Sequence, residues 1–189
     1  MEDFDYEEVV PGILVFDNVI DNPEEIIKHS LTKKDQWRDS EIFTNREGNA
    51  VVNSNIRNTR VLDASGLWSS DVEWYFLAKE IWKRADFYAK KYKVSFSWME
   101  VVQILHYRAG TGFYDSHVDN NPSDPRVFSS VLYLNDVEEG GETNFDFLGI
   151  TVKPKAGRMI IFPADFLHRH AALPPISEDK FAAVTWYRP

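Results

Sequence analysis

Residues 180–187 read KFAAVTWY, a short run of apolar, β-branched and aromatic residues of the kind that forms strands. Similar runs predict strands over 95–107, 127–134, 143–147, 150–153 and 158–163. Turn-forming residues separate them: Asn120-Asn121-Pro122, Gly140-Gly141, Leu148-Gly149 and Pro174-Pro175. Many short strands divided by turns predict a sandwich or a jelly roll in the second half of the chain.

The first half of the chain has a different pattern. Residues 9–20 predict a pair of short strands broken at Pro11-Gly12, and the sequence DNPEE at 21–25 predicts the start of a helix that runs to about residue 34. Residues 38–60 are polar and lack periodicity, so we expect a long loop there, with at most a short strand.

The clearest helix is predicted over about 71–92. Its apolar residues recur at helical spacing, and Ser70 and Glu73 form a capping-box pattern at its start. The fold class is therefore α+β. We expect one domain over 1–189, with helical support at about 20–93 packed on a jelly-roll core at about 94–188.

Composition excludes several kinds of chemistry. The 189 residues include no cysteine, so disulfides, thiolate zinc sites and a cysteine nucleophile are impossible, and a metal must bind to His, Asp or Glu. The net charge of −9 argues against nucleic acid as a partner. No apolar run approaches the ~20 residues that cross a bilayer, and Met1-Glu2-Asp3 lacks a basic signal-peptide head. We expect a cytoplasmic protein with no membrane partner.

Three of the five histidines form a pattern that suggests a metal site. His117-Val118-Asp119 would point its two polar side chains to the same face if the backbone is extended, and His168-Arg169-His170 follows some fifty residues later. Two imidazoles and one carboxylate leave positions open on a metal, as non-haem Fe(II) requires when it binds a cosubstrate and dioxygen together. The other two, His29 and His106, are expected to be structural.

Lys180 occupies an otherwise apolar strand. A buried ammonium is costly unless it meets an anion, so this lysine is a candidate anchor for a carboxylate.

The order of these motifs resembles the 2-oxoglutarate/Fe(II)-dependent dioxygenases, in particular the prolyl 4-hydroxylase-like branch. The resemblance covers about residues 100–188. It rests on Tyr107-x-x-Gly110, His117-x-Asp119, Arg126 before 129–137, Gly140-Gly141-Glu142-Thr143-x-Phe145, Val152-x-Pro154-x-x-Gly157, His170-x-x-x-Pro174, Lys180 and Trp186. The family implies a double-stranded β-helix, or jelly roll, with supporting helices.

The resemblance also implies roles for individual residues. His117, Asp119 and His170 would bind Fe(II), and Lys180 would pair with the distal carboxylate of the cosubstrate 2-oxoglutarate. The hydroxyls of Tyr107 and Thr143 would hold the same carboxylate, and Trp186 would line the site.

His170 is preferred to His168 because of its spacing to Pro174 and Lys180. His168 would then lie behind the ligands or at the entrance. Ascorbate is expected to stimulate the enzyme.

The substrate is the least determined part of the prediction. The resemblance favours hydroxylation of an unactivated C–H bond in a peptidyl side chain, prolyl first. A free amino acid, another small molecule or a nucleobase stays open as substrate, as does a metal-binding jelly-roll module without redox chemistry. Arg126 is expected to make a structural ion pair, and the loop at 44–60, with Arg57 and Arg60, could close over the site.

Overall fold

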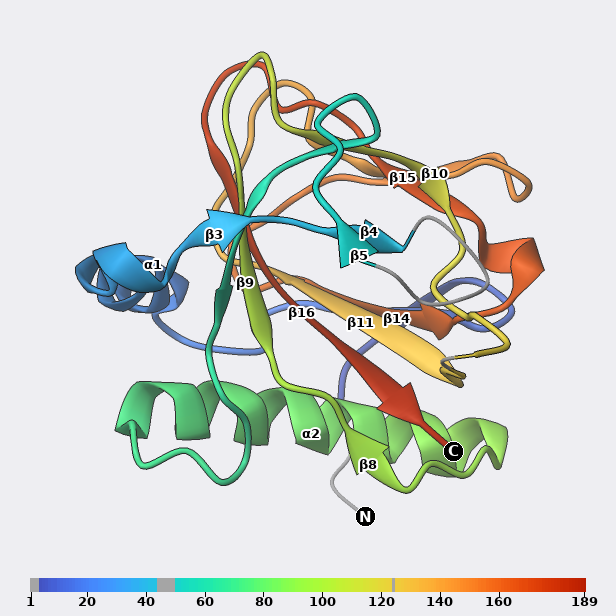
Figure 1. Ribbon diagram of the computed structural model, residues 1–189. Helices are drawn as coiled ribbons and strands as arrows, with labels where there is room; N and C mark the ends of the chain where they lie inside the picture. The colour runs from blue at the N-terminus through green and yellow to red at the C-terminus, as the bar shows by residue number, and fades with distance from the viewer. Residues whose placement is uncertain (1–3, 44–49, 124) are drawn as a thin grey trace.

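A computed structural model describes residues 4–43, 50–123 and 125–189 (Figure 1). The helices are α1 (Pro23–Thr32), α2 (Val72–Tyr92) and two 3-10 turns, η1 (Lys34–Gln36) and η2 (Phe166–His168). The strands of the first half are β1 (Glu7–Val10), β2 (Ile13–Phe16), β3 (Arg38–Asp39), β4 (Ile42–Phe43), β5 (Ala50–Val51), β6 (Arg57–Asn58) and β7 (Arg60–Asp63). Those of the second half are β8 (Trp98–Met99), β9 (Gln103–Tyr107), β10 (Phe113–His117), β11 (Phe128–Tyr133), β12 (Thr143–Phe145), β13 (Ile150–Val152), β14 (Met159–Pro163), β15 (His170–Ala172) and β16 (Lys180–Arg188).

Two antiparallel sheets form the body of the molecule. The larger sheet has the order β1-β2-β14-β11-β16-β9-β7-β3, with β8 paired to β16, and the smaller has the order β13-β12-β15-β10-β6. A separate ribbon pairs β4 with β5. Apart from the hairpins β1–β2 and β12–β13, neighbours in both sheets are not consecutive in the sequence, which is the topology of a jelly roll and not of a simple meander.

Side chains along each strand alternate between the two faces of the larger sheet, and both faces are buried. Along β16, the side chains of Phe181, Ala183 and Tyr187 pack in the core cluster that contains the apolar face of α2. Ala182 and Val184 belong instead to clusters on the opposite face. Figure 1 shows α2 lying along one side of this sheet. One face is therefore sealed by helices, and the other faces the smaller sheet.

Apolar side chains fill the space between the sheets at one end, and polar side chains line it at the other. Ile13, Tyr133, Phe145, Ile160 and Phe162 fill the apolar end. Lys180 is on β16 in the same alternation as Ala182 and Val184, so its side chain enters this space as well. The predicted α+β class and double-stranded β-helix are confirmed.

The predicted elements are mostly found, with differences at their edges. Both helices, the pair β1 and β2 and the main C-terminal strands form as expected. The capping box was wrong: the residue that caps α2 is Asp71, and no side-chain capping bond is made there, because the Asp71 carboxylate binds His29 and Lys33. The single-domain organisation of the whole chain stays a prediction.

Three groups of strands are not evident from the sequence pattern. β10 is largely polar, β15 has only three residues, and residues 38–60 contain β3, β4, β5 and β6 where a loop with at most a short strand was expected. They are strands because partner strands supply the hydrogen bonds, and not because of their own propensity. Strands from before residue 93 thus complete both sheets, while residues 44–49 of the predicted loop lie outside the described residues.

Within the described part of the chain, no helix is long and apolar enough to cross a membrane.

Candidate metal and anion site

Two adjacent strands of the smaller sheet bring the histidines together. His117 ends β10 and His170 begins β15, and the two are opposite each other in the antiparallel register. Asp119 follows β10, and its Oδ1 lies 3.4 Å from Nε2 of His117 while its Oδ2 lies 3.8 Å from Nε2 of His170. All three ligand atoms lie within 4.8 Å of one another, which is close enough to share one metal ion.

Each of the two imidazoles makes a hydrogen bond through Nδ1. This bond determines which ring nitrogen is free to bind a metal. Nδ1 of His117 lies 2.8 Å from the carbonyl oxygen of Asp115, and Nδ1 of His170 lies 3.0 Å from that of His168. A carbonyl can only accept, so each Nδ1 carries the proton and each Nε2 has a free lone pair. Burial, together with the neighbouring His117, lowers the pKa of His170 to about 4, so it stays neutral near pH 7.

Asp119 supplies the negative charge. Burial alone would raise the pKa of this carboxyl, but the adjacent His170 and His117 and the hydrogen bond from Ser129 hold the pKa well below its usual range. The Ser129 hydroxyl donates to Oδ2 at 2.6 Å, which orients the carboxylate toward the histidines. A carboxylate and two neutral imidazole nitrogens are a donor set that fits Fe(II).

Lys180 lies in the same cavity and is buried, with 1% of its surface exposed. Its ammonium donates to the carbonyl of Gly141 at 2.6 Å and lies 4.7 Å from the centre of the Tyr107 ring. Burial lowers the pKa of Lys180 to about 7, although the charge of Glu142 opposes this shift, and within the described residues no carboxylate forms an ion pair with the ammonium. An amine held in this way lacks an anion, so the site fits a ligand carboxylate.

Hydroxyl groups surround this lysine. Tyr107 pairs directly with Lys180 in the register of β9 and β16 and lines the cavity. Burial raises the pKa of Tyr107 to about 12, so its hydroxyl keeps its proton and can donate. Thr143 also lines the cavity and accepts a hydrogen bond of 2.8 Å from Tyr133. Tyr133, whose ring is 5.4 Å from the ammonium, is part of this cluster; it lies in the motif at 129–137, for which the sequence predicted no role in the site.

One cavity brings together every residue predicted for the site. Its lining includes His117, Asp119, His170, Lys180, Tyr107, Thr143 and Trp186. The larger sheet adds an apolar wall, made by Leu105, Val131, Ala182 and Val184. These walls restrict water around the polar groups, which strengthens their electrostatic interactions.

Arg57 also lines the cavity. The sequence analysis named it only as a residue of the loop at 44–60 that could close over the site. It comes from β6, which pairs with β10 so that Arg57 lies opposite Tyr114. Its guanidinium lies 4.6 Å from the centre of the Tyr114 ring, which in turn stacks on His117 at 3.6 Å. Arg57 is 9% exposed and donates only to neutral oxygens, those of Thr59 and the Glu41 carbonyl. Within the described residues it has no carboxylate partner.

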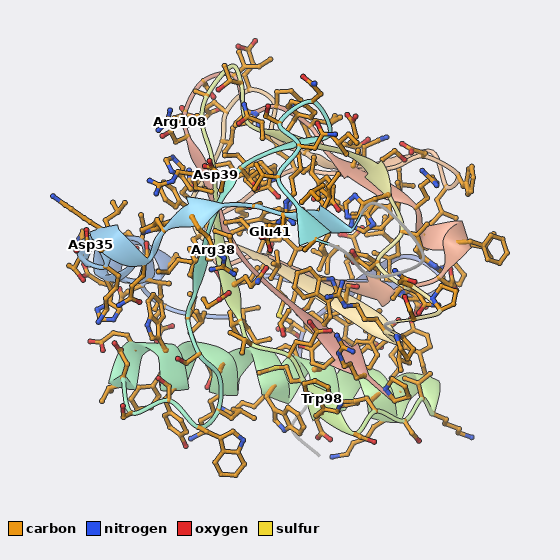
Figure 2. The ribbon with its side chains drawn as sticks, in the orientation of Figure 1. Asp35, Arg38, Asp39, Glu41, Trp98 and Arg108 are labelled. Atoms are coloured by element: carbon orange, nitrogen blue, oxygen red, sulfur yellow. The ribbon has the colours of Figure 1, made fainter. Side chains whose placement is uncertain are left out.

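A second cavity adjoins the first. The two share Arg57, Tyr114, Asp119 and Trp186, so the inner cavity continues outward past the metal ligands. Arg38, Glu41, Glu100, Arg126 and Arg188 are among the residues of this outer cavity. Figure 2 labels Arg38 and Glu41 on this face of the molecule.

The other singled-out residues have structural contacts. Arg126 makes a two-point ion pair with Glu100, as expected, and its guanidinium lies 4.0 Å from the centre of the Trp186 ring. His29 binds Asp71 at 2.9 Å and His106 binds Asp179 at 2.7 Å, as expected of structural histidines. The side chain of Arg60 donates to the carbonyl of Trp37.

His168 lies behind the ligands and not at the entrance. Its ring is buried and binds Asp165 at 2.7 Å, and its carbonyl accepts the bond from His170. The two histidines do not alternate on a strand, because His168 ends the 3-10 turn η2 and only His170 belongs to β15.

Comparison with known sequences agrees with this geometry. Residues 102–188 match the 2OG-Fe(II) oxygenase superfamily. The chain is 35% identical to the probable prolyl 4-hydroxylase 9 of Arabidopsis thaliana over 47% of this chain and 41% of that protein. It is 31% identical to prolyl 4-hydroxylase subunit alpha-1 of Gallus gallus over 46% of this chain and 20% of that protein. The chain thus matches less than half the length of these relatives.

Solved structures share the fold over nearly the whole chain. The prolyl hydroxylase of Trichoplax adhaerens gives a TM-score of 0.77 at 16% identity, covering 96% of this chain and 85% of that one. The viral collagen prolyl hydroxylase of Paramecium Bursaria Chlorella virus-1 gives 0.70 at 23% identity, covering 93% and 94%.

The strand topology therefore defines a double-stranded β-helix, and its donor set fits an iron site. Residues 102–188 match the model of the 2OG-Fe(II) oxygenase superfamily, and over this part the chain is prolyl 4-hydroxylase-like. This family implies Fe(II) and 2-oxoglutarate, and the donor atoms of the inner cavity fit both.

Proposed function

We propose that this protein is a 2-oxoglutarate- and Fe(II)-dependent dioxygenase that hydroxylates a prolyl side chain in a peptide. The observation that carries the proposal is one cavity that joins three metal-ligand atoms to a buried, unpaired ammonium. A site that only stored a metal would have no use for that ammonium. The chemistry of a metal-bound dicarboxylate needs both.

When bound, iron and 2-oxoglutarate supply with dioxygen the oxidising power to place a hydroxyl on a C–H carbon, releasing succinate and carbon dioxide. The chain's own residues bind and orient. His117, His170 and Asp119 would hold the metal and leave its other positions open. Hydrogen bonds to the Asp115 and His168 carbonyls keep both imidazoles in the correct tautomer before the metal binds.

Lys180 would bind the distal carboxylate of 2-oxoglutarate. Its ammonium retains donors beyond the one used by Gly141, and Tyr107 and Thr143 would offer hydroxyls to the same carboxylate. Because strand pairing fixes Lys180 opposite Tyr107, this end of the cosubstrate would be held in one orientation. Trp186 would line the site on the side of the outer cavity.

The outer cavity is the expected path of the peptide. It begins at Asp119 and Trp186 and carries the buried guanidinium of Arg57, whose remaining donors could bind a peptide carbonyl. The names of the relatives support a prolyl substrate: two of the solved structures are a collagen prolyl hydroxylase and a prolyl hydroxylase bound to a hypoxia-inducible-factor peptide fragment.

The test is turnover with a library of proline-containing peptides, Fe(II) and 2-oxoglutarate. We expect succinate to form together with peptides that gain one oxygen atom on proline, detected by mass spectrometry, and neither product with His170→Ala. Succinate formed equally without any peptide, and no oxidised peptide, would contradict the prolyl assignment.

Products that gain oxygen on a free amino acid, a small molecule or a nucleobase would instead support those substrates. Metal binding without any 2-oxoglutarate turnover would indicate a module without redox chemistry. Stimulation by ascorbate and a cytoplasmic location remain predictions from the sequence.

A further inference from the structure

A groove lined by tryptophan lies outside the candidate active site, between residues 65–70, strand β8 and helix α2. Trp68, Trp82 and Trp98 line it, together with Ser65, Gly66, Leu67, Ser69, Ser70, Ser97, Met99, Glu100 and Val101. Trp68 is 98% exposed and Trp98 is 52% exposed. Large aromatic rings gathered at the surface to this degree mark a binding surface.

The groove is held in place by hydrogen bonds and ring packing. The amide of Ala64 donates to the carbonyl of Val102 at 2.8 Å, and the amide of Val102 donates to that of Ser65 at 3.0 Å. Trp82 packs edge-on against Phe96 at 5.1 Å, so its ring is fixed on α2. The backbone of the groove and the Trp82 ring are therefore held before a ligand binds, which reduces the entropy lost on binding.

In the described part of the chain, the indole N–H groups of the groove are free donors, and four serines and Glu100 also line it. Among the described residues, the indole N–H groups of Trp68, Trp82 and Trp98 have no protein acceptor, whereas buried Trp37 donates to the carbonyl of Ser30 at 3.0 Å. Flat aromatic faces with free donors complement a chain that has flat apolar rings, free carbonyls and few N–H groups. A proline-rich segment in the polyproline II conformation has these properties.

The groove adjoins the outer cavity at Glu100, which borders both. Arg188 lines the outer cavity, pairs with Trp98 across β16 and β8, and has its guanidinium 5.0 Å from the centre of the Trp98 ring. In Figure 2, Trp98 lies below Arg38 and Glu41, at the level of α2. An extended chain in the outer cavity would have to pass only Glu100 to reach the tryptophans.

We propose that this groove docks a proline-rich stretch of the substrate polypeptide, beside the residue that is hydroxylated. The proposal rests on the proposed function, because it takes the occupant to be a peptide with proline. Docking at a second point raises the effective concentration of the target residue at the metal, so it selects long proline-rich chains over short peptides.

Binding of a fluorescent decaproline peptide tests the groove without requiring turnover. We expect Trp68→Ala to weaken its binding at least about ten-fold, as truncation of an anchoring tryptophan does. The side chain of Trp68 is almost fully exposed, so this variant should fold normally. Phe76→Ala is the matched control: Phe76 is a 55% exposed ring on α2 that lines a separate depression near Asn18. It should bind as the wild type does, and a Gly-Ser peptide of equal length should bind to neither protein.

Steady-state kinetics distinguish the docking proposal from the proposed prolyl hydroxylase function. With a long proline-rich substrate, Trp68→Ala should raise KM about ten-fold at unchanged kcat, while a short peptide should show no difference. Equal binding and equal KM for the variant and the wild type would overturn the docking proposal and leave the proposed function standing. Decaproline binding that depends on Trp68, with no peptide ever hydroxylated, would support the groove and overturn the prolyl substrate.

A second copy of the chain is the competing occupant. Sedimentation should show the same species for the wild type and Trp68→Ala at all concentrations. A dimer that dissociates in the variant would assign the groove to self-association and overturn the proposal.

Discussion

At its buried end the cavity is lined by side chains of regularly paired strands, whereas toward the outer cavity it is lined by side chains from very short strands and turns. Lys180 and Tyr107 face each other across β16 and β9, which pair over five successive residues. Arg57 comes from the two-residue strand β6 and is held by Tyr114 and by neutral oxygens. We infer a division of roles, in which the regularly paired strands would hold the cosubstrate and the less regular region would select the substrate.

The metal ligands should be the most sensitive point of the buried end. His170→Ala is expected to abolish Fe(II) binding and turnover, because the remaining His117 and Asp119 leave the metal with too few protein ligands. His168→Ala should retain iron with a reduced rate, since only its backbone carbonyl contacts His170. Iron content of the purified proteins and succinate formation measure both. The reverse result would assign the ligand to His168.

Substitution of Lys180 tests the part of the cavity that would bind the carboxylate, separately from the candidate metal ligands. Lys180→Met should weaken 2-oxoglutarate binding roughly ten- to a hundred-fold, the value of a charge-assisted hydrogen bond of about 1.5–3 kcal/mol, and leave Fe(II) binding nearly intact. Lys180→Arg should restore it only in part, because the guanidinium fork is larger and aimed differently. Anaerobic calorimetry gives the affinities. Unchanged affinity in Lys180→Met would show that the cosubstrate binds elsewhere.

The pH dependence of 2-oxoglutarate binding is a second test of the role of Lys180 at the buried end of the cavity. The pKa of Lys180 in the free protein is lowered to about 7 by burial, so above pH 7 the amine must take up a proton to bind the dicarboxylate. The affinity should fall by up to about ten-fold per pH unit above 7. Proton uptake at pH 8, measured by calorimetry in two buffers of different ionisation enthalpy, checks this. Lys180→Met should show no such uptake.

The lowered pKa of Lys180 also predicts how the free energy of unfolding depends on pH. This free energy should rise with pH over the range in which the affinity for 2-oxoglutarate falls. In the unfolded chain the pKa of Lys180 returns to its ordinary value of 10.5, so between pH 7 and 10.5 the unfolded state binds more protons than the folded state. The contribution of this group to the free energy of unfolding therefore rises with pH over that window and is constant below it. Denaturant titrations of the wild type and Lys180→Met, in the absence of ligands, compare the two slopes. Parallel slopes would mean that the amine is already charged and solvated.

Arg57 tests the substrate side, where we expect the smallest effect. Arg57→Gln should raise KM for the peptide by about ten-fold, the value of one hydrogen bond from a charged donor, with little effect on 2-oxoglutarate affinity. Arg57→Lys keeps the charge without the planar fork and should recover only part of the loss. Steady-state kinetics with each substrate varied in turn give the two constants. A larger effect on 2-oxoglutarate than on the peptide would reverse the proposed division.

The sequence by itself determined the strands that bury apolar residues on both faces and the identity of the chemical groups. Phe181, Ala183 and Tyr187 alternate with Lys180, Ala182 and Val184, so the run at 180–187 already placed the lysine among core residues. The motif His117-x-Asp119 identified two of the candidate ligands for the same reason, since local spacing decides which side chains share a face.

Only the tertiary structure decided which distant groups meet. β10, β15 and β6 have weak strand propensity and form because partners more than fifty residues away supply their hydrogen bonds. That pairing sets His170 opposite His117 and brings Arg57 over Tyr114, and it puts His168 on a turn where strand alternation does not apply. Local spacing cannot reveal such neighbours, because antiparallel register is fixed by the whole sheet and by the burial of its two faces.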